Sequence, residues 1–386
     1  MLTNLEKTPW PWFGGKADAA PLVWEALGDV PHYVEPFAGS LAVLLRRPHA
    51  SNRTYYSETV NDLDGLLVNA WRSMQMAPDE MAAAASWPVS EADLHARHLA
   101  LLRWRADRNL ERLMGDPLFH DPVMAGWWAW GQSCWIGSGW CSGRGAWVVG
   151  ADGRIHKQSR KARELGVFRQ LPHVGTDGQG VNRPQAREPG VKQQLPHIGC
   201  DGRGVNRPQA REPGVGDYHP MTMPELRRWF RFLSARLRHV RILNGDWGRA
   251  CTSGVLRTLS VRSGKGPCGV FLDPPYMVDG NRSDRLYTHD DGDTVAAAVQ
   301  RWCIERTCDD DVRIVLAGLE GEHDILSDCH GWRCVPWYRA GFLKGGMGNV
   351  AGSGANQQHR ERLWMSPSCR LPASERSQVS LFNAGG

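Results

Sequence analysis

Two consecutive prolines directly after an apolar run are the feature that most constrains the fold of this chain. Residues 269–272 read Gly-Val-Phe-Leu, and residues 273–276 read Asp-Pro-Pro-Tyr. The run has the length and composition of a strand buried in a parallel sheet, and Pro274 ends it because proline has no backbone N–H for the ladder. Ligands of open α/β sheets bind where such strands end. The sequence therefore predicts an α/β fold with a ligand site at residues 273–276.

These four residues form a stiff set of hydrogen-bond acceptors beside an aromatic ring. The Asp273 carboxylate and the Pro274 carbonyl can accept both N–H bonds of an exocyclic amine, while Tyr276 stacks on its ring. Pro275 adds stiffness because its φ angle is fixed. Drawing both hydrogens toward acceptors would localise the nitrogen lone pair for attack on an electrophilic methyl group. The alternative is a strand end followed by an ordinary turn.

A second motif lies far upstream. Residues 33–45 read as a short strand, a turn of small residues and the start of an apolar helix, and such a turn lets a cofactor approach the backbone. Asp62 follows at roughly the twenty-residue spacing of a carboxylate that binds a ribose hydroxyl, with Glu58 and Asp64 as weaker candidates. The alternative is that Asp62 caps a helix over residues 63–71.

Four motifs thus follow one another: Trp-Phe-Gly-Gly-Lys at 12–16, Glu-Pro-Phe-Ala-Gly at 35–39, Asn-Asp at 61–62 and Asp-Pro-Pro-Tyr at 273–276. In this order they resemble the DNA adenine methylase (Dam) family of S-adenosylmethionine-dependent N6-adenine DNA methyltransferases. The resemblance implies a doubly wound, mostly parallel, Rossmann-like sheet with an inserted target-recognition domain. It also implies site-specific methyl transfer to the amine of an adenine flipped out of double-stranded DNA.

The resemblance assigns roles to individual residues. The catalytic residues that it implies are Asp273, Pro274, Pro275 and Tyr276. The residues that it places on S-adenosylmethionine are Trp12, Lys16, Glu35, Phe37, Ala38, Gly39, Asp62, Asp246 and Asp273. For Asp246, in an Asn-Gly-Asp-Trp segment, ordinary turn chemistry is the alternative.

Two positions depart from the family pattern. Leu41 stands where a glycine is common, so close backbone approach must rest on Gly39 and Ser40. Pro11 stands where some members carry a basic residue that reads DNA. A base contact of those members is therefore not transferred to this chain.

The domain organisation follows from the motif order. We expect a catalytic domain from residues 1–75 and 240–366, including strands at 312–318 and 360–367. Residues 76–239 would form the recognition domain, and residues 367–386, which are small and polar, a disordered tail. Helices with a basic face are predicted over residues 78–113, which carry Arg97, Arg103, Arg105 and Arg108.

The predicted insertion contains a tandem repeat. Residues 170–191 recur almost unchanged at 194–215, which indicates a recent duplication and favours a phage-like lineage. The repeat is rich in Gly and Pro and cannot bury a core of its own. Its arginines recur in register and would track DNA phosphates or read guanine edges, or else belong to a solvated spacer. They are Arg183, Arg187, Arg207 and Arg211.

Tryptophans on a glycine-rich frame precede the repeat. An enzyme that methylates a base must extract it from the duplex, and an aromatic wedge can fill the gap. Trp135 and Trp140 are the wedge candidates, whereas Trp127 and Trp128 are predicted to lie in a core. Core packing is the alternative for all of them.

Composition is compatible with this interpretation. The 386 residues carry a net charge of +5, which permits a polyanionic partner without requiring one. The sequence lacks an apolar segment of signal or membrane-spanning type, so we expect a cytoplasmic protein, in a bacterial host if phage-encoded, acting as a monomer or weak dimer. The ten cysteines contain no Cys-x-x-Cys pair. Free buried thiols are favoured over zinc, and no metal is expected.

Rival functions stay open at this point. Within the enzyme class they are methylation of cytosine N4, of RNA or of protein glutamine. A catalytically impaired DNA-binding protein is a different class of alternative, and Leu41 leaves room for it. The role could be restriction–modification or protection of a phage.

Overall fold

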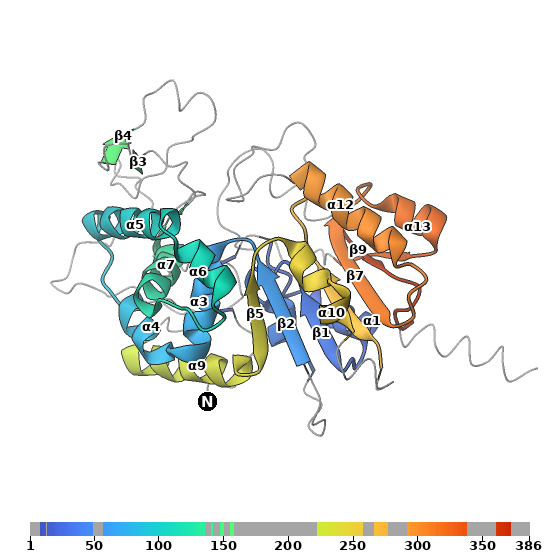
Figure 1. Cartoon of the computed structure of the whole chain (residues 1–386), viewed down its shortest axis with the longest axis horizontal. Helices are drawn as coiled ribbons and strands as arrows, with labels where there is room; N and C mark the ends of the chain where they lie inside the picture. The colour runs from blue at the N-terminus through green and yellow to red at the C-terminus, as the bar shows by residue number, and fades with distance from the viewer. Residues whose placement is uncertain are drawn as a thin grey trace, which may run out of the picture. The chain divides into compact units, whose positions relative to one another are not determined.

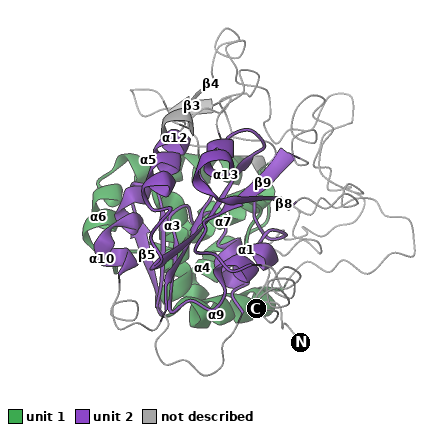
Figure 2. Ribbon diagram, turned by 90° about the vertical axis from the view of Figure 1, so that its right-hand side faces the viewer, with its two compact units in different colours: residues 1–14, 63–238, 283–290 green, residues 15–62, 239–282, 291–386 purple. Residues whose placement is uncertain are grey.

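The computed structural model describes residues 8–12, 14–48, 57–135, 140–141, 147–149, 155–157, 222–257, 266–276, 292–337 and 360–371. The chain divides into two compact units, coloured separately in Figure 2. One contains residues 1–14, 63–238 and 283–290, and the other contains residues 15–62, 239–282 and 291–386. We call the unit that contains residues 15–62 the sheet unit, and the unit that contains residues 63–238 the helical unit. The tandem repeat with its four arginines lies outside the described residues.

The sheet unit is built on a seven-stranded sheet with the strand order β5-β2-β1-β6-β7-β9-β8 (Figure 1). The strands are β1 (His32–Glu35), β2 (Ser57–Asp62), β5 (Val240–Asn244), β6 (Cys268–Leu272), β7 (Val312–Leu319), β8 (Arg333–Pro336) and β9 (Glu361–Met365). Strands β5, β2, β1, β6 and β7 run parallel, and β9 is antiparallel to both β7 and β8. This topology confirms the predicted doubly wound, mostly parallel fold.

Apolar side chains explain why these segments form the sheet. All five residues of β6 are buried, as expected for a central parallel strand. Its Val270 packs in one core cluster with Ile314 of β7 and with Val299 and Cys303 of α12 (Gly292–Glu305). The other helices of this unit are α1 (Ala20–Leu27), α2 (Ala42–Leu45), the 3-10 helix η1 (Trp247–Cys251), α10 (Ser253–Leu256) and α13 (Asp324–His330).

The thiols of the described residues are free. Cys251, Cys268 and Cys303 are buried in the sheet-unit core, where burial raises the pKa of each thiol. Cys303 lies on α12 and Cys334 on β8. Within the described ranges, no group of three metal-ligating side chains gathers at one place.

The predicted disordered tail begins too early. Residues 367–371 continue from β9 as an ordered turn, in which the Cys369 N–H donates to the Ser366 carbonyl at 2.9 Å. The Arg370 N–H donates to the Ala26 carbonyl at the end of α1 at 2.8 Å. The prediction of disorder is therefore wrong for these residues, because backbone bonds to α1 hold a segment with few apolar side chains.

The helical unit contains α3 (Gly65–Met76), α4 (Pro78–Ala85), α5 (Glu91–Ala106), α6 (Asn109–Gly115), α7 (Pro122–Cys134) and α9 (Met223–Leu237), with a short antiparallel pair of β3 (Trp147–Val149) and β4 (Ile155–Lys157). Helix α9 begins with a capping box between Thr222 and Glu225. No helix within the described ranges combines the length and apolarity needed to cross a bilayer.

Tryptophans form much of the core of the helical unit. Trp10 lies 4.4 Å from Trp71 and 5.1 Å from Trp128 between ring centroids, and all three are buried. Arg97, predicted on the basic face of a helix, is 7% exposed and lies 4.1 Å from the centroid of the Trp130 ring. That prediction is wrong for Arg97, because its planar guanidinium makes cation–π contacts with tryptophan rings.

Candidate active site

Asp273 leaves the carboxyl end of β6, at the edge of the sheet where the sequence predicts a ligand site. Its Oδ1 lies 3.0 Å from Nζ of Lys16, a side chain that is only 4% exposed. Burial raises the pKa of Asp273, and the neighbouring ammonium opposes that rise by favouring the carboxylate. The structure thus brings Lys16 of the first motif to Asp273 of the last.

Aromatic and acidic side chains surround the same ammonium. Lys16 Nζ lies 5.1 Å from the centroid of the Tyr276 ring and 5.9 Å from that of Trp337. It lies 4.0 Å from Oε2 of Glu361, which accepts a hydrogen bond from the Tyr276 hydroxyl at 3.4 Å. Sequence reasoning missed Glu361 and Trp337. A charged residue opening the apolar strand β9 is the signal that could have found Glu361.

The turn after β1 is tied to the end of β2. The Gly39 N–H donates to Oδ2 of Asp62 at 2.9 Å, and the Ala38 N–H donates to the Asn61 carbonyl at 2.8 Å. Gly39 has a φ of +45°, and Leu41 follows in the left-handed region at +55°. Asp62 therefore lies against the glycine turn.

The alternative helix cap falls on a different residue. The side chain of Asp64 accepts the Leu66 N–H at 2.9 Å and caps α3, which begins at Gly65. Asp62 precedes the cap and ends β2. The carboxylate of Glu58, the weaker ribose candidate, is held 3.0 Å from Arg47.

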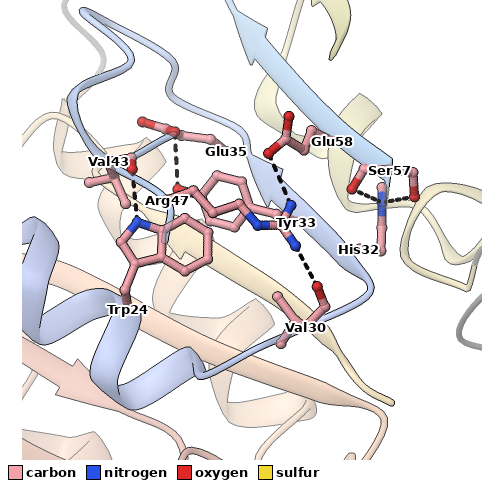
Figure 3. A network of polar contacts seen from close by, with 9 residues as sticks. All are labelled: Trp24, Val30, His32, Tyr33, Glu35, Val43, Arg47, Ser57 and Glu58. Atoms are coloured by element: carbon pink, nitrogen blue, oxygen red, sulfur yellow. Dashed lines mark hydrogen bonds and ion pairs between the residues drawn. The ribbon is translucent and has the colours of Figure 1, made fainter. Parts of the chain in front are cut away.

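Glu35 belongs to a buried network beneath this turn, which Figure 3 shows from close by. Its Oε2 accepts the Tyr33 hydroxyl at 3.0 Å, and the side chain is 3% exposed. Burial raises the pKa of Glu35 from 4.5 to about 8. Nearby, Arg47 donates to Glu58 and to the Val30 carbonyl. Glu35 thus ends β1 directly before the turn, with its side chain inside the fold.

The end of β5 joins the same edge. Asn61 Nδ2 donates to the carbonyls of Pro36 at 3.1 Å and Gly245 at 2.9 Å, so one amide links the ends of three strands. Asp246 caps η1 by accepting the Gly248 N–H at 2.8 Å, which is the turn chemistry named as the alternative for it. Asp246 thus also lies at the carboxyl edge of the sheet.

An aromatic pair borders the β1 turn. The rings of Phe37 and Trp247 stack with centroids 6.3 Å apart and planes inclined by 22°, and both side chains are partly buried. Trp247 was not singled out from the sequence, although it follows Asp246 directly. The turn therefore brings a carboxylate and apolar ring surface together within one unit.

Residues 12–96 match the family model of the D12 class N6 adenine-specific DNA methyltransferases. The resemblance to the DNA adenine methylase family is thereby confirmed. The matched segment carries Lys16, the β1 turn and Asp62, whereas Asp273 and Tyr276 lie beyond it. A search of curated proteins found no match to this chain.

The side chains at the β1 turn fit the cofactor that methyltransferases of this family generally use. S-adenosylmethionine presents ribose hydroxyls, an adenine ring and a cationic sulfonium. A carboxylate such as Asp62 accepts several hydrogen bonds, so it can hold Gly39 and a ribose hydroxyl together. Phe37 and Trp247 provide ring surface for the adenine. The chemistry of this donor set is compatible with the cofactor.

Three further predicted residues that the structure describes lie in the helical unit. Trp12 is partly buried, with its ring centroid 6.3 Å from that of Trp128. Trp135 and Trp140 are each 8% exposed, and their centroids lie 5.3 Å apart. The Trp140 indole donates to the Trp128 carbonyl at 3.1 Å. This arrangement favours core packing over the wedge role, because a wedge must reach the duplex.

Proposed function

We propose that this chain is an S-adenosylmethionine-dependent DNA methyltransferase that methylates adenine at N6. The observation that carries the proposal is the Asp273 carboxylate, which follows β6 at the carboxyl edge of the sheet and lies 3.0 Å from the Lys16 ammonium. Methyl transfer to an amine needs hydrogen-bond acceptors that orient the amine next to the methyl donor. Asp273 supplies such an acceptor at the sheet edge that also carries the glycine turn.

The residues after β6 would orient the target amine. The ionised carboxylate of Asp273 and the carbonyl of Pro274 would each accept one N–H bond, which leaves the nitrogen lone pair directed at the incoming methyl group. Lys16 helps this arrangement because it favours the ionised form of Asp273. Tyr276 would stack on the base, and Pro275 would keep the segment stiff. No covalent enzyme intermediate is required.

The β1 turn would hold the cofactor, with Gly39 and Ser40 giving close backbone approach and Ala38 lining the turn. Asp62 would accept a hydrogen bond from a ribose hydroxyl. When bound, S-adenosylmethionine supplies the electrophilic methyl group. Phe37 would flank its adenine, with Asp246 close by, while Glu35 would brace the turn from within. Trp12 stays a proposed contact from the first motif.

The DNA would be engaged by the inserted region, acting on a base flipped out of the duplex. The repeat arginines Arg183, Arg187, Arg207 and Arg211 would track phosphates, so their loss should flatten the salt dependence of DNA binding. We expect the protein to act in the cytoplasm, in a bacterial host if phage-encoded, as a monomer or weak dimer.

The direct test is to incubate the purified protein with unmodified duplex DNA and S-adenosylmethionine, digest the DNA and identify methylated nucleosides by mass spectrometry. The proposal predicts N6-methyldeoxyadenosine. Methylation of cytosine N4, or of RNA supplied in parallel, would contradict the substrate. Cofactor binding measured by calorimetry separates an enzyme from a DNA-binding protein that has lost catalysis, because the latter needs no cofactor.

A further inference from the structure

The Lys16 ammonium lies between two carboxylates, of which the proposed mechanism uses only one. Its Nζ is 3.0 Å from Asp273 Oδ1 and 4.0 Å from Glu361 Oε2. The same Glu361 oxygen accepts a hydrogen bond from the Tyr276 hydroxyl at 3.4 Å. One oxygen thus contacts both the cation that holds Asp273 and the ring that would stack on the target base.

The sheet topology explains how Glu361 reaches this position. Strand β9 runs antiparallel to β7, and its first residue, Glu361, lies opposite Leu319, the last residue of β7. Because β6 and β7 are parallel neighbours, the start of β9 falls at the carboxyl edge where Asp273 leaves β6. Because β9 runs in the opposite direction, its first residue lies at the same end of the sheet as the last residues of the parallel strands.

The burial of Glu361 shows that its environment is specific. The side chain is 14% exposed, and a carboxylate with so little contact with water needs polar partners. Tyr276 and Lys16 supply a hydrogen bond and an opposite charge. The next residue, Arg362, pairs instead with Glu320 at 2.6 Å. Two adjacent charged residues of β9 thus serve two separate contacts.

We infer that Glu361 is a positioning residue of the methyl-transfer site, which orients the Tyr276 ring through its hydroxyl. This inference rests on the proposed function of Asp273 and Tyr276. A phenol ring turns about its side-chain bonds unless packing or a hydrogen bond fixes it, and stacking requires one plane. The Lys16 ammonium over the ring is the second restraint. In this role Glu361 would act through the Tyr276 hydroxyl and not on the reacting groups.

Three variants separate positioning from a merely structural role. Glu361→Ala removes the acceptor, Glu361→Gln keeps an acceptor oxygen without the charge, and Tyr276→Phe removes the donor hydroxyl. Glu320→Gln is the matched control, because it removes the carboxylate of the neighbouring ion pair with Arg362.

The kinetic prediction is a loss in kcat with an unchanged KM for S-adenosylmethionine. Glu361→Ala lowers kcat about tenfold or more, since misplacement of a positioning group acts on the oriented complex. Glu361→Gln recovers most of this loss, and Glu320→Gln keeps the wild-type kcat. In the Tyr276→Phe background, Glu361→Ala causes little further loss in kcat, because both changes remove the same hydrogen bond. Losses that multiply, or a wild-type kcat in Glu361→Ala, would overturn the inference.

A second readout does not depend on activity. The chain has seven tyrosines, so incorporation of 3-fluorotyrosine gives a simple fluorine NMR spectrum, in which the Tyr276 signal is the one lost in Tyr276→Phe. The inference predicts that this signal shifts in Glu361→Ala and stays in place in Glu320→Gln. An unmoved signal in Glu361→Ala refutes the inference whatever the activity. A wild-type protein without methyltransferase activity would instead count against the proposed function, while the fluorine signal still decides the contact.

Discussion

Leu41 carries a backbone conformation that glycine adopts more readily, and this gives a sharp prediction. Its φ is +55° and its ψ is +28°, and its side chain is fully buried. A residue with a Cβ in this region costs about 1–2 kcal/mol. Removing a buried leucine side chain costs about 2–5 kcal/mol. Burial outweighs strain, so both Leu41→Ala and Leu41→Gly should lower the free energy of unfolding.

The informative quantity is the difference between these two variants. Both remove the side chain, but alanine keeps the Cβ that is strained at positive φ. The glycine variant should therefore be the more stable by about 1 kcal/mol. This reverses the order expected inside a regular helix, where alanine is favoured by about 1 kcal/mol. Urea unfolding monitored by tryptophan fluorescence measures the difference. An alanine variant as stable as the glycine variant would refute the strained turn.

Three further predictions concern other parts of the molecule. Asp64→Ala should lower the free energy of unfolding by about 1 kcal/mol because α3 loses its cap, and no loss in urea unfolding would contradict the cap. Trp140→Ala should destabilise the protein by about 3–5 kcal/mol without DNA present, whereas a wedge would leave the unfolding midpoint unchanged. The pKa of Glu35 is raised from 4.5 to about 8, so the folded state retains a proton that the unfolded chain loses. Stability should fall as pH rises through that window, and Glu35→Gln should flatten the fall in a pH series of unfolding midpoints.

The sheet and the edge that carries Asp273 were predictable because local chemistry specifies them. An apolar run stopped by two prolines reads as a buried strand with a defined end, and β6 ends at Leu272 as expected. The small-residue turn at Gly39 and the carboxylate of Asp62 were found in the same way. Only the structure shows that Asp62 holds the turn while Asp64 caps the helix. In the sequence, either position suits either role.

Long-range pairings could not be predicted. Nothing near Glu361 in the sequence indicates Tyr276 or Lys16, since the pairing arises only when β9 reverses beside β7. Trp140 and Arg97 were ambiguous for a related reason. An aromatic on a glycine-rich frame, or an arginine on a helix, fits both a surface and a core until its neighbours are known.

The proposed function depends most on Asp273, which would orient an adenine amine for methyl transfer. The most direct test compares wild type with Asp273→Asn, an isosteric change that removes the charge, by quantifying N6-methyldeoxyadenosine formed on unmodified duplex DNA in a single turnover. We expect product in the wild type and a rate lower by about a hundredfold or more in the variant, with cofactor binding retained. A variant that methylates adenine at the wild-type rate, or a wild type that methylates a different base, would contradict it.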